Sequence, residues 1–167
     1  MLVLVAYGSK RGGTEGLAQM VADGLRDEGL DVEVADARRV TALARYDAVV
    51  VGGALYAQRW HRDATRLVRR HARELRHMPT FLFSSGPLDE SAAQKEIPPV
   101  PGVRDLMGLI GAGGHATFGG RLAPDATGVV AKAMAKKHSG DWRDADDVRE
   151  WAHGVAHVLK AGTARAA

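Results

Sequence analysis

A glycine-rich segment near the start of the chain has the composition of a phosphate-binding loop. It reads Gly8-Ser9-Lys10-Arg11-Gly12-Gly13-Thr14 and joins an apolar run to an amphipathic one. Glycines let the backbone fold so that several N–H groups point inward, and a helix start adds partial positive charge. Ser9 and Thr14 add hydroxyl donors, and Lys10 or Arg11 adds charge. The segment lacks the Lys-Ser/Thr of triphosphate loops and the G-x-G-x-x-G of dinucleotide loops. The alternative is a turn that only connects two elements.

A second segment, Gly52–His61, follows another apolar run and has the residues to border a flat ring. Small and aliphatic side chains leave room for such a ring, and we expect it to lie against Gly53, Ala54, Leu55 and Tyr56. Tyr56, and less clearly Trp60, could stack on the ring. The alternative is that both aromatic side chains are packing residues.

A third segment follows the apolar run TFLFS and carries hydroxyls and backbone donors suited to the polar edge of the same ring. The residues that we expect to contribute are Ser84, Ser85, Gly86 and Asp89. The alternative is a turn made by Pro87. We expect no metal site, and no side chain stands out as an obligatory acid or base. His61 is the most plausible single candidate for that role, although a lone histidine is more often a surface residue.

The elements that must position these segments alternate along the chain. Continuous apolar runs predict buried strands, and apolar residues at helical spacing predict amphipathic helices. The predicted strands are Leu2–Ala6, Val32–Ala35, Tyr46–Val51, Thr80–Ser84 and His115–Leu122. The predicted helices are Thr14–Glu28, Asp63–Leu75, Val103–Ile110 and Asp144–Leu159, with Ala126–Lys137 a weak helix or an ordered loop. This order predicts an α/β fold in three layers, a doubly wound parallel sheet of five strands.

The composition bounds the class of protein. A length of 167 residues suits one domain, which we place at residues 1–162, with 163–167 a disordered tail. The absence of cysteine excludes disulfides, thiolate metal sites and cysteine catalysis, and fits a reducing cytoplasm. No apolar run approaches the roughly 20 residues of a membrane span, and the apolar start lacks the features of a signal peptide.

The net charge of +3 is concentrated partly in the arginine-rich stretch Arg59–Arg76. One interpretation is the solvated face of an amphipathic helix, and the other is attraction to an acidic partner, such as anionic lipid or a carboxylated substrate. Nucleic acid is not favoured, because the stretch carries one aromatic residue and no recognised binding motif.

The three segments together resemble the flavodoxin-like family. Ser9-Lys10-Arg11-Gly12-Gly13-Thr14 is similar to the flavodoxin phosphate loop T/S-x-T-G-x-T, with Arg11 in place of a threonine. The stretches Tyr46–His61, Arg69–Pro79 and Ser139–Asp144 resemble the menaquinone-dependent protoporphyrinogen oxidase branch of that family. The resemblance implies strand order 2-1-3-4-5 and FMN at the carboxyl ends of the strands, where ligands bind in such sheets.

The same resemblance implies two-electron oxidation of a porphyrinogen, with a quinone as the acceptor, in a cytoplasmic protein that could contact the inner face of the membrane. The stretch Pro124–His138 departs from that branch, since it is short and has no aromatic residue. The alternatives are a non-enzymatic electron carrier and a flavin-free interaction module. Carriers of this family are typically acidic, whereas this chain is basic.

Overall fold

Five parallel strands form the central sheet in the computed structural model of the chain, which describes residues 1–10, 12–86, 96–122, 140–141 and 143–166. The strands are β1 (Leu2–Gly8), β2 (Asp31–Asp36), β3 (Ala48–Tyr56), β5 (Thr80–Ser85) and β6 (Gly114–Phe118). They lie in the order β2-β1-β3-β5-β6, and the two-residue strand β4 (Arg59–Trp60) pairs with β3 in the antiparallel sense. Over the parallel strands this is the order 2-1-3-4-5, so the predicted fold is confirmed.

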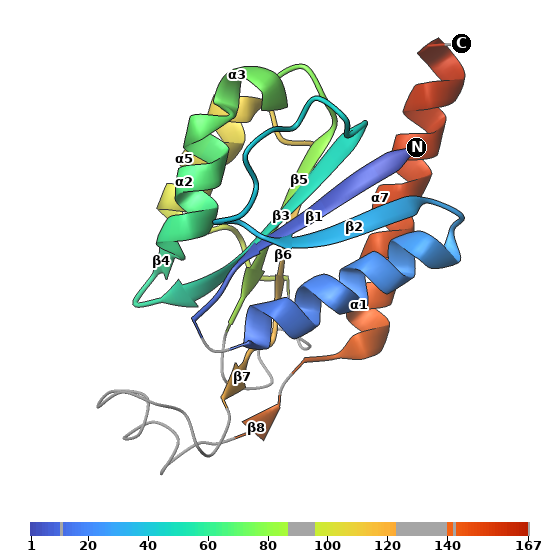
Figure 1. Ribbon diagram of the computed structural model, residues 1–167. Coiled ribbons are helices and arrows are strands. Elements are labelled where there is room, and N and C mark those ends of the chain that lie inside the picture. Colours follow the sequence, from blue (N-terminus) through green and yellow to red (C-terminus); the bar gives the residue numbers. More distant parts are fainter. Residues whose placement is uncertain (11, 87–95, 123–139, 142, 167) are drawn as a thin grey trace.

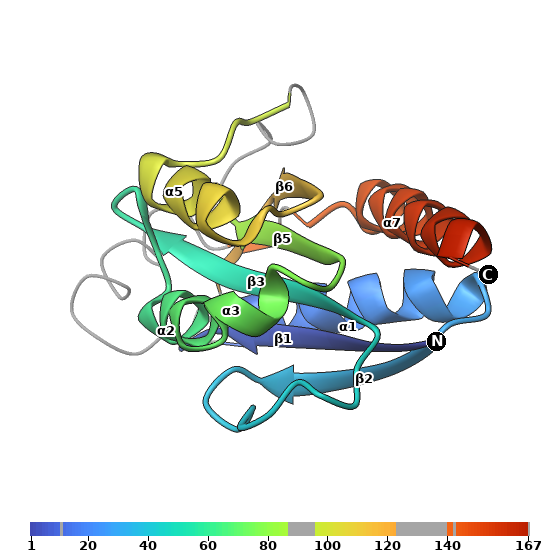
Figure 2. The ribbon, with the colours of Figure 1, turned by 90° about the horizontal axis from the view of Figure 1, so that it is seen from above.

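Helices cover both faces of the sheet, which gives three layers (Figures 1 and 2). One face carries α1 (Gly13–Asp27) and α7 (Ala145–Ala166), and the other carries α2 (Arg62–Arg70), α3 (Ala72–Leu75) and α5 (Pro101–Ile110). Side chains alternate along a strand, so Val3 and Val5 of β1 join the first core, whereas Leu4 and Ala6 join the second. All four side chains are fully buried, which explains why the strands read as unbroken apolar runs.

Two predicted element boundaries differ from the structure because of local packing. Gly52 and Gly53 do not end β3; both stay in register with β1 and β5, and the strand continues to Tyr56. The predicted helix Asp63–Leu75 is interrupted at His71, whose backbone leaves helical geometry between α2 and α3. The Nδ1 atom of His71 lies 2.7 Å from the Glu74 carboxylate, so this side chain is bonded to the short second helix.

The end of the chain also differs from the sequence-based expectation. β6 ends at Phe118, and after Gly119-Gly120 the chain forms β7 (Arg121–Leu122), which pairs with β8 (Gly140–Asp141). The predicted helix or loop Ala126–Lys137 lies outside the described residues. Helix α7 continues to Ala166, through most of the segment expected to be a disordered tail. Within the described part of the chain, none of the helices combines the length and the hydropathy that a membrane crossing requires.

Candidate functional site

The turn between β1 and α1 has the geometry of an anion cradle. Gly12 precedes the helix with a φ of 75°, a left-handed conformation that glycine adopts without steric cost. No side chain caps the helix start, so the first N–H groups of α1 have no capping acceptor from this segment. Thr14 in the first turn is 1% exposed, and its Oγ1 has no hydrogen-bond partner among the described residues. A buried hydroxyl without a partner is costly, so this position fits a ligand oxygen, such as that of a phosphate.

The other residues of the predicted phosphate loop differ in how far they are exposed to solvent. Ser9 is half-buried and Lys10 is exposed, whereas Gly13 is buried at the first position of α1. Arg11 lies outside the described residues. The loop therefore combines buried backbone and a buried hydroxyl with an exposed cation, an arrangement that fits a phosphate monoester at a surface.

The parallel register brings the three predicted segments into one row at the carboxyl ends of the strands. Gly8 of β1 is the partner of Gly53 in β3, and Gly53 is the partner of Ser84 in β5. Ala54 and Ser85 form the next pair in the same direction. These strand ends lie together in Figure 1, below the labels of β1 and β3. The structure therefore assembles the glycine-rich loop, the ring-bordering segment and the hydroxyl segment at one edge of the sheet.

The second and third segments also touch beyond the strand ends. A Cβ atom placed on Gly86 would lie 3.4 Å from the Cβ of Leu55, so the two backbones approach closely there. The N–H of Gly86 donates to the carbonyl of Phe118 at 2.9 Å. This N–H is therefore bonded within the protein. Asp89 lies outside the described residues.

Tyr56 and Trp60 occupy different environments. Tyr56 is 45% exposed and precedes a tight turn in which Ala57 and Gln58 both have positive φ, as in the turns that join hairpin strands. The hairpin folds Trp60 back under the sheet edge, where it is 7% exposed and donates its Nε1–H to the carbonyl of Phe83 at 3.3 Å. The indole covers the face of Gly53. Of the two alternatives for Trp60, the structure supports packing, because its indole is a core side chain, whereas the Tyr56 side chain lies at the surface.

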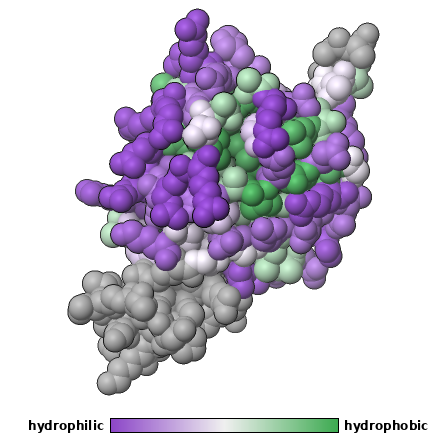
Figure 3. All heavy atoms as spheres, viewed as in Figure 1, coloured by the Kyte–Doolittle hydropathy of each residue, from purple (hydrophilic) through white to green (hydrophobic). Residues whose placement is uncertain are grey.

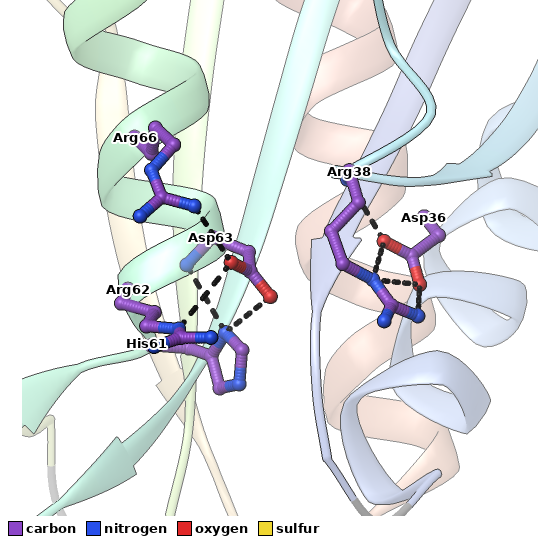
Figure 4. Close-up of polar contacts among 6 residues, drawn as sticks. All are labelled: Asp36, Arg38, His61, Arg62, Asp63 and Arg66. Carbon is purple, nitrogen blue, oxygen red and sulfur yellow. Dashed lines mark hydrogen bonds and ion pairs between the residues drawn. The ribbon is translucent and has the colours of Figure 1, made fainter.

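His61 ends this hairpin and begins α2 (Figure 4). Its Nδ1 accepts a hydrogen bond from the backbone N–H of Asp63 at 3.3 Å, and the ring is buried. The Asp63 carboxylate lies 3.7 Å from Arg62, from Arg66 and from the His61 ring. One carboxylate in the first turn of α2 therefore interacts with all three side chains. Across from it, Arg38 makes a bidentate pair with Asp36 at the end of β2, in which Nε donates to Oδ1 and an Nη–H donates to Oδ2. His61 also lies against Gly8, the first residue of the predicted phosphate loop, a contact that no local pattern indicates.

Sequence reasoning missed one further polar pair at the site. Ser84 Oγ shares a hydrogen bond of 2.9 Å with Nε2 of His115, which comes from β6. Burial lowers the pKa of His115 to about 4, so the ring is neutral at pH 7. The Ser84 side chain is thus directed to the neighbouring strand. The available sequence signal is weak, because it consists only of a histidine at an inward position of a predicted strand.

The buried ring of His115 makes stability depend on pH. Between pH 6.5 and about 4 the unfolded chain binds a proton at this position, while the folded protein keeps the ring neutral. The free energy of unfolding should therefore fall as the pH drops through this window, by about 2 kcal/mol from this group after allowance for its partial exposure. Urea denaturation at pH 7.5 and pH 4.5 measures the loss. The variant His115→Asn, which can still bond Ser84, should lose less stability over the same interval, and equal losses would contradict the assignment.

Comparison with known proteins agrees with this geometry. Residues 4–147 match the family model Flavodoxin_5, described as a flavodoxin domain. Among curated proteins, the chain is 28% identical over 86 residues to the "Protoporphyrinogen IX dehydrogenase [quinone]" of Escherichia coli strain K12. The match covers 50% of this chain and 48% of that protein, so the chain matches about half the length of this relative.

Solved structures show the same fold at low sequence identity. The rubredoxin oxygen:oxidoreductase of Desulfovibrio gigas aligns with a TM-score of 0.65 at 16% identity, over 96% of this chain and 36% of that one. An archaeal flavodoxin aligns with a TM-score of 0.62 at 15% identity, over 96% of this chain and 99% of its own. Thr14, the open start of α1 and the row of strand ends fit a flavin mononucleotide. The chain is therefore a flavodoxin-like protein of the Flavodoxin_5 family, and its cofactor is FMN.

Proposed function

We propose that this chain oxidises protoporphyrinogen IX and passes the electrons to a quinone. The observation that carries the proposal is the 28% identity to a quinone-dependent protoporphyrinogen IX dehydrogenase. The aligned 86 residues are 50% of this chain, which belongs to a family of flavin-dependent redox proteins. In each step two hydrogens leave the porphyrinogen as two electrons and two protons, and one quinone takes up the same number to become a quinol.

The cofactor supplies the redox chemistry, and the protein binds and orients it. The first turn of α1 and Thr14 would hold the phosphate, together with Ser9 and Lys10. The strand ends at Gly53 and Ser85, with the exposed Tyr56 at the hairpin, would border the isoalloxazine ring. No described side chain is placed as an obligatory acid or base for this reaction.

The arginines of α2 and its flanks fit a substrate that carries carboxylates. All seven arginines from Arg59 to Arg76 are exposed, and Asp63 and Glu74 are the two carboxylates in that stretch. The face over α2 and α3 is mostly hydrophilic in Figure 3. A cavity of about 90 Å³ opens between α2 and the end of β2, and Arg38, Asp63, Arg66 and Arg70 contribute to its lining. Guanidinium groups pair bidentately with carboxylates, so this cavity would receive a propionate.

Quinones reside in membranes, so the proposal also places the protein at the cytoplasmic face of a membrane during part of its cycle. The alternative, a non-enzymatic carrier between redox proteins, would use the same flavin site without the arginine cavity. The two functions differ in whether a porphyrinogen reduces the flavin directly.

The test is an absorption spectrum of the purified protein under anaerobic conditions, before and after addition of protoporphyrinogen IX. Flavin bands that bleach with substrate and return with a menaquinone analogue would support the oxidase. Flavin bands that keep their absorbance when the substrate is added, but bleach with a flavoprotein reductase, would favour the carrier. Neither outcome depends on how tightly FMN binds, provided that the flavin is loaded in excess.

The arginine cavity gives this test a second arm. The double variant Arg66→Gln/Arg70→Gln should raise the KM for protoporphyrinogen about tenfold and leave kcat unchanged, because uniform binding is lost and the flavin site is not touched. Arg104→Gln is the matched control, since Arg104 is an exposed arginine on α5. Equal KM values for the two variants would show that the cavity does not receive the substrate.

A further inference from the structure

His61 carries a ring nitrogen whose hydrogen has no acceptor. The Nδ1 atom accepts the N–H of Asp63, so in the neutral ring the hydrogen must be on Nε2. The side chain is 6% exposed, and Nε2 is buried without a hydrogen-bond partner among the described residues. Burial lowers the pKa of this ring, with Lys10 and Arg62 acting in the same direction and Asp63 and Asp36 opposing them. The ring is thus neutral at pH 7 and offers one unused donor.

The position of the ring indicates what the donor faces. A Cβ atom on Gly8 would lie 2.9 Å from Nδ1 of His61 and 2.9 Å from the backbone N of Ala64, so the start of α2 packs on the backbone that opens the phosphate loop. In Figure 4 the ring extends from the first turn of α2 toward the end of the strands, with Nε2 on the corner away from Asp63. The charge of Lys10, a residue of that loop, acts on the His61 ring.

A buried donor without an acceptor destabilises a folded protein, and such donors are rare. Thr14 Oγ1 is a second buried polar atom without a partner, and it belongs to the same loop that His61 contacts. The two atoms come from elements on opposite faces of the sheet, Thr14 from α1 and His61 from the start of α2. A group with several acceptor oxygens at this loop supplies the kind of acceptor that each of the two atoms lacks.

We propose that His61 donates its Nε2–H to a phosphate oxygen of FMN. This makes the junction of β4 and α2 a second wall of the phosphate site, opposite the glycine-rich loop. The inference rests on FMN as the cofactor but not on the identity of the reductant. It also assigns a role to a histidine that is too buried to exchange protons with a substrate.

Two variants of His61 distinguish the role of its Nε2–H as a donor from the role of its Nδ1 as the N-cap acceptor of α2. His61→Asn keeps a side-chain oxygen that can accept the Asp63 N–H, since asparagine is among the best N-cap residues, and it removes the Nε2 donor. His61→Gln extends an amide N–H about as far as Nε2 and loses the cap. We expect His61→Asn to weaken FMN binding about tenfold with little effect on riboflavin, which lacks the phosphate. His61→Gln should retain most of the FMN affinity and lose some stability.

The measurement is a flavin fluorescence titration with FMN and with riboflavin, together with urea denaturation of the flavin-free protein. In the unmodified protein, the ¹⁵N signal of His61 should report the Nε2–H tautomer, and its proton should shift downfield when FMN is added. Equal affinity losses for FMN and riboflavin, or no loss for either, would overturn the role of His61. No substrate is used, so the result stands or falls separately from porphyrinogen oxidation.

Discussion

Replacing Gly52 by alanine is expected to destabilise the folded protein by about 3 kcal/mol. Gly52 lies beside Phe83 in the register of β3 and β5, and a methyl group on Gly52 would overlap the Phe83 ring. The ring cannot move aside, because it is fully buried and its centroid lies 6.1 Å from that of Phe118 and 6.2 Å from that of Trp151. Overpacking in such a core forces strained rotamers or backbone shifts. Urea denaturation of the flavin-free protein measures the effect.

The control for this prediction is a glycine with open space around it. Gly154 lies in α7, and an added Cβ there meets nothing within 4 Å. Gly154→Ala should therefore be neutral or stabilise by roughly 0.5–1 kcal/mol, through helix propensity. A double variant Gly52→Ala/Phe83→Ala should cost less than the sum of its single changes, because the smaller side chain makes room for the new methyl group. Additive costs would mean that Gly52 is needed for another reason.

The difference between Gly52 and Gly154 shows where sequence reasoning stops. The order of strands and helices followed from local patterns, since unbroken apolar runs such as Leu2–Ala6 are buried on both sides. The pair Gly52-Gly53 predicts a strand end, because glycine weakens strands in general. In the protein these glycines provide space for Phe83 and Trp60, which are 31 and 7 positions further along the chain than Gly52 and Gly53 respectively. A pattern cannot predict a partner that only the strand register brings close.

Some features of the candidate site can likewise be predicted from the sequence, and others depend on the fold. The phosphate loop is continuous in sequence, so its glycines and hydroxyls could be identified before the fold was known. Ser84 and His115 are 31 residues apart and meet only because β5 and β6 are neighbours. Trp60 is turned into the core by a hairpin whose two central residues, Ala57 and Gln58, are not the Asn and Gly that signal such turns. Composition therefore predicts where the candidate site lies, and the register determines which side chains meet there.

Replacing Thr14 by valine is expected to weaken FMN binding roughly 100-fold and to stabilise the flavin-free protein by about 1 kcal/mol. The Oγ1 atom is buried without a partner among the described residues, so the folded apoprotein bears the cost of desolvating it. Valine has almost the same shape and a similar helix propensity, so the packing of this first turn of α1 against its surroundings is preserved. The same hydroxyl would gain a charged acceptor when a phosphate binds, and hydrogen bonds to charged groups are the stronger ones.

Opposite changes in stability and affinity distinguish a ligand-binding hydroxyl from a packing residue. Fluorescence titration with FMN gives the affinity, and urea denaturation with and without FMN gives both stabilities, because a ligand that binds the native state stabilises it by mass action. Thr14→Ser keeps the hydroxyl and removes a buried methyl group, so it should retain FMN affinity and lose stability. A valine variant that is less stable and binds FMN normally would remove Thr14 from the phosphate site. In that case the desolvation cost of the buried Thr14 hydroxyl would have no connection with ligand binding. The uncapped N-terminus of α1 alone would then hold the anion.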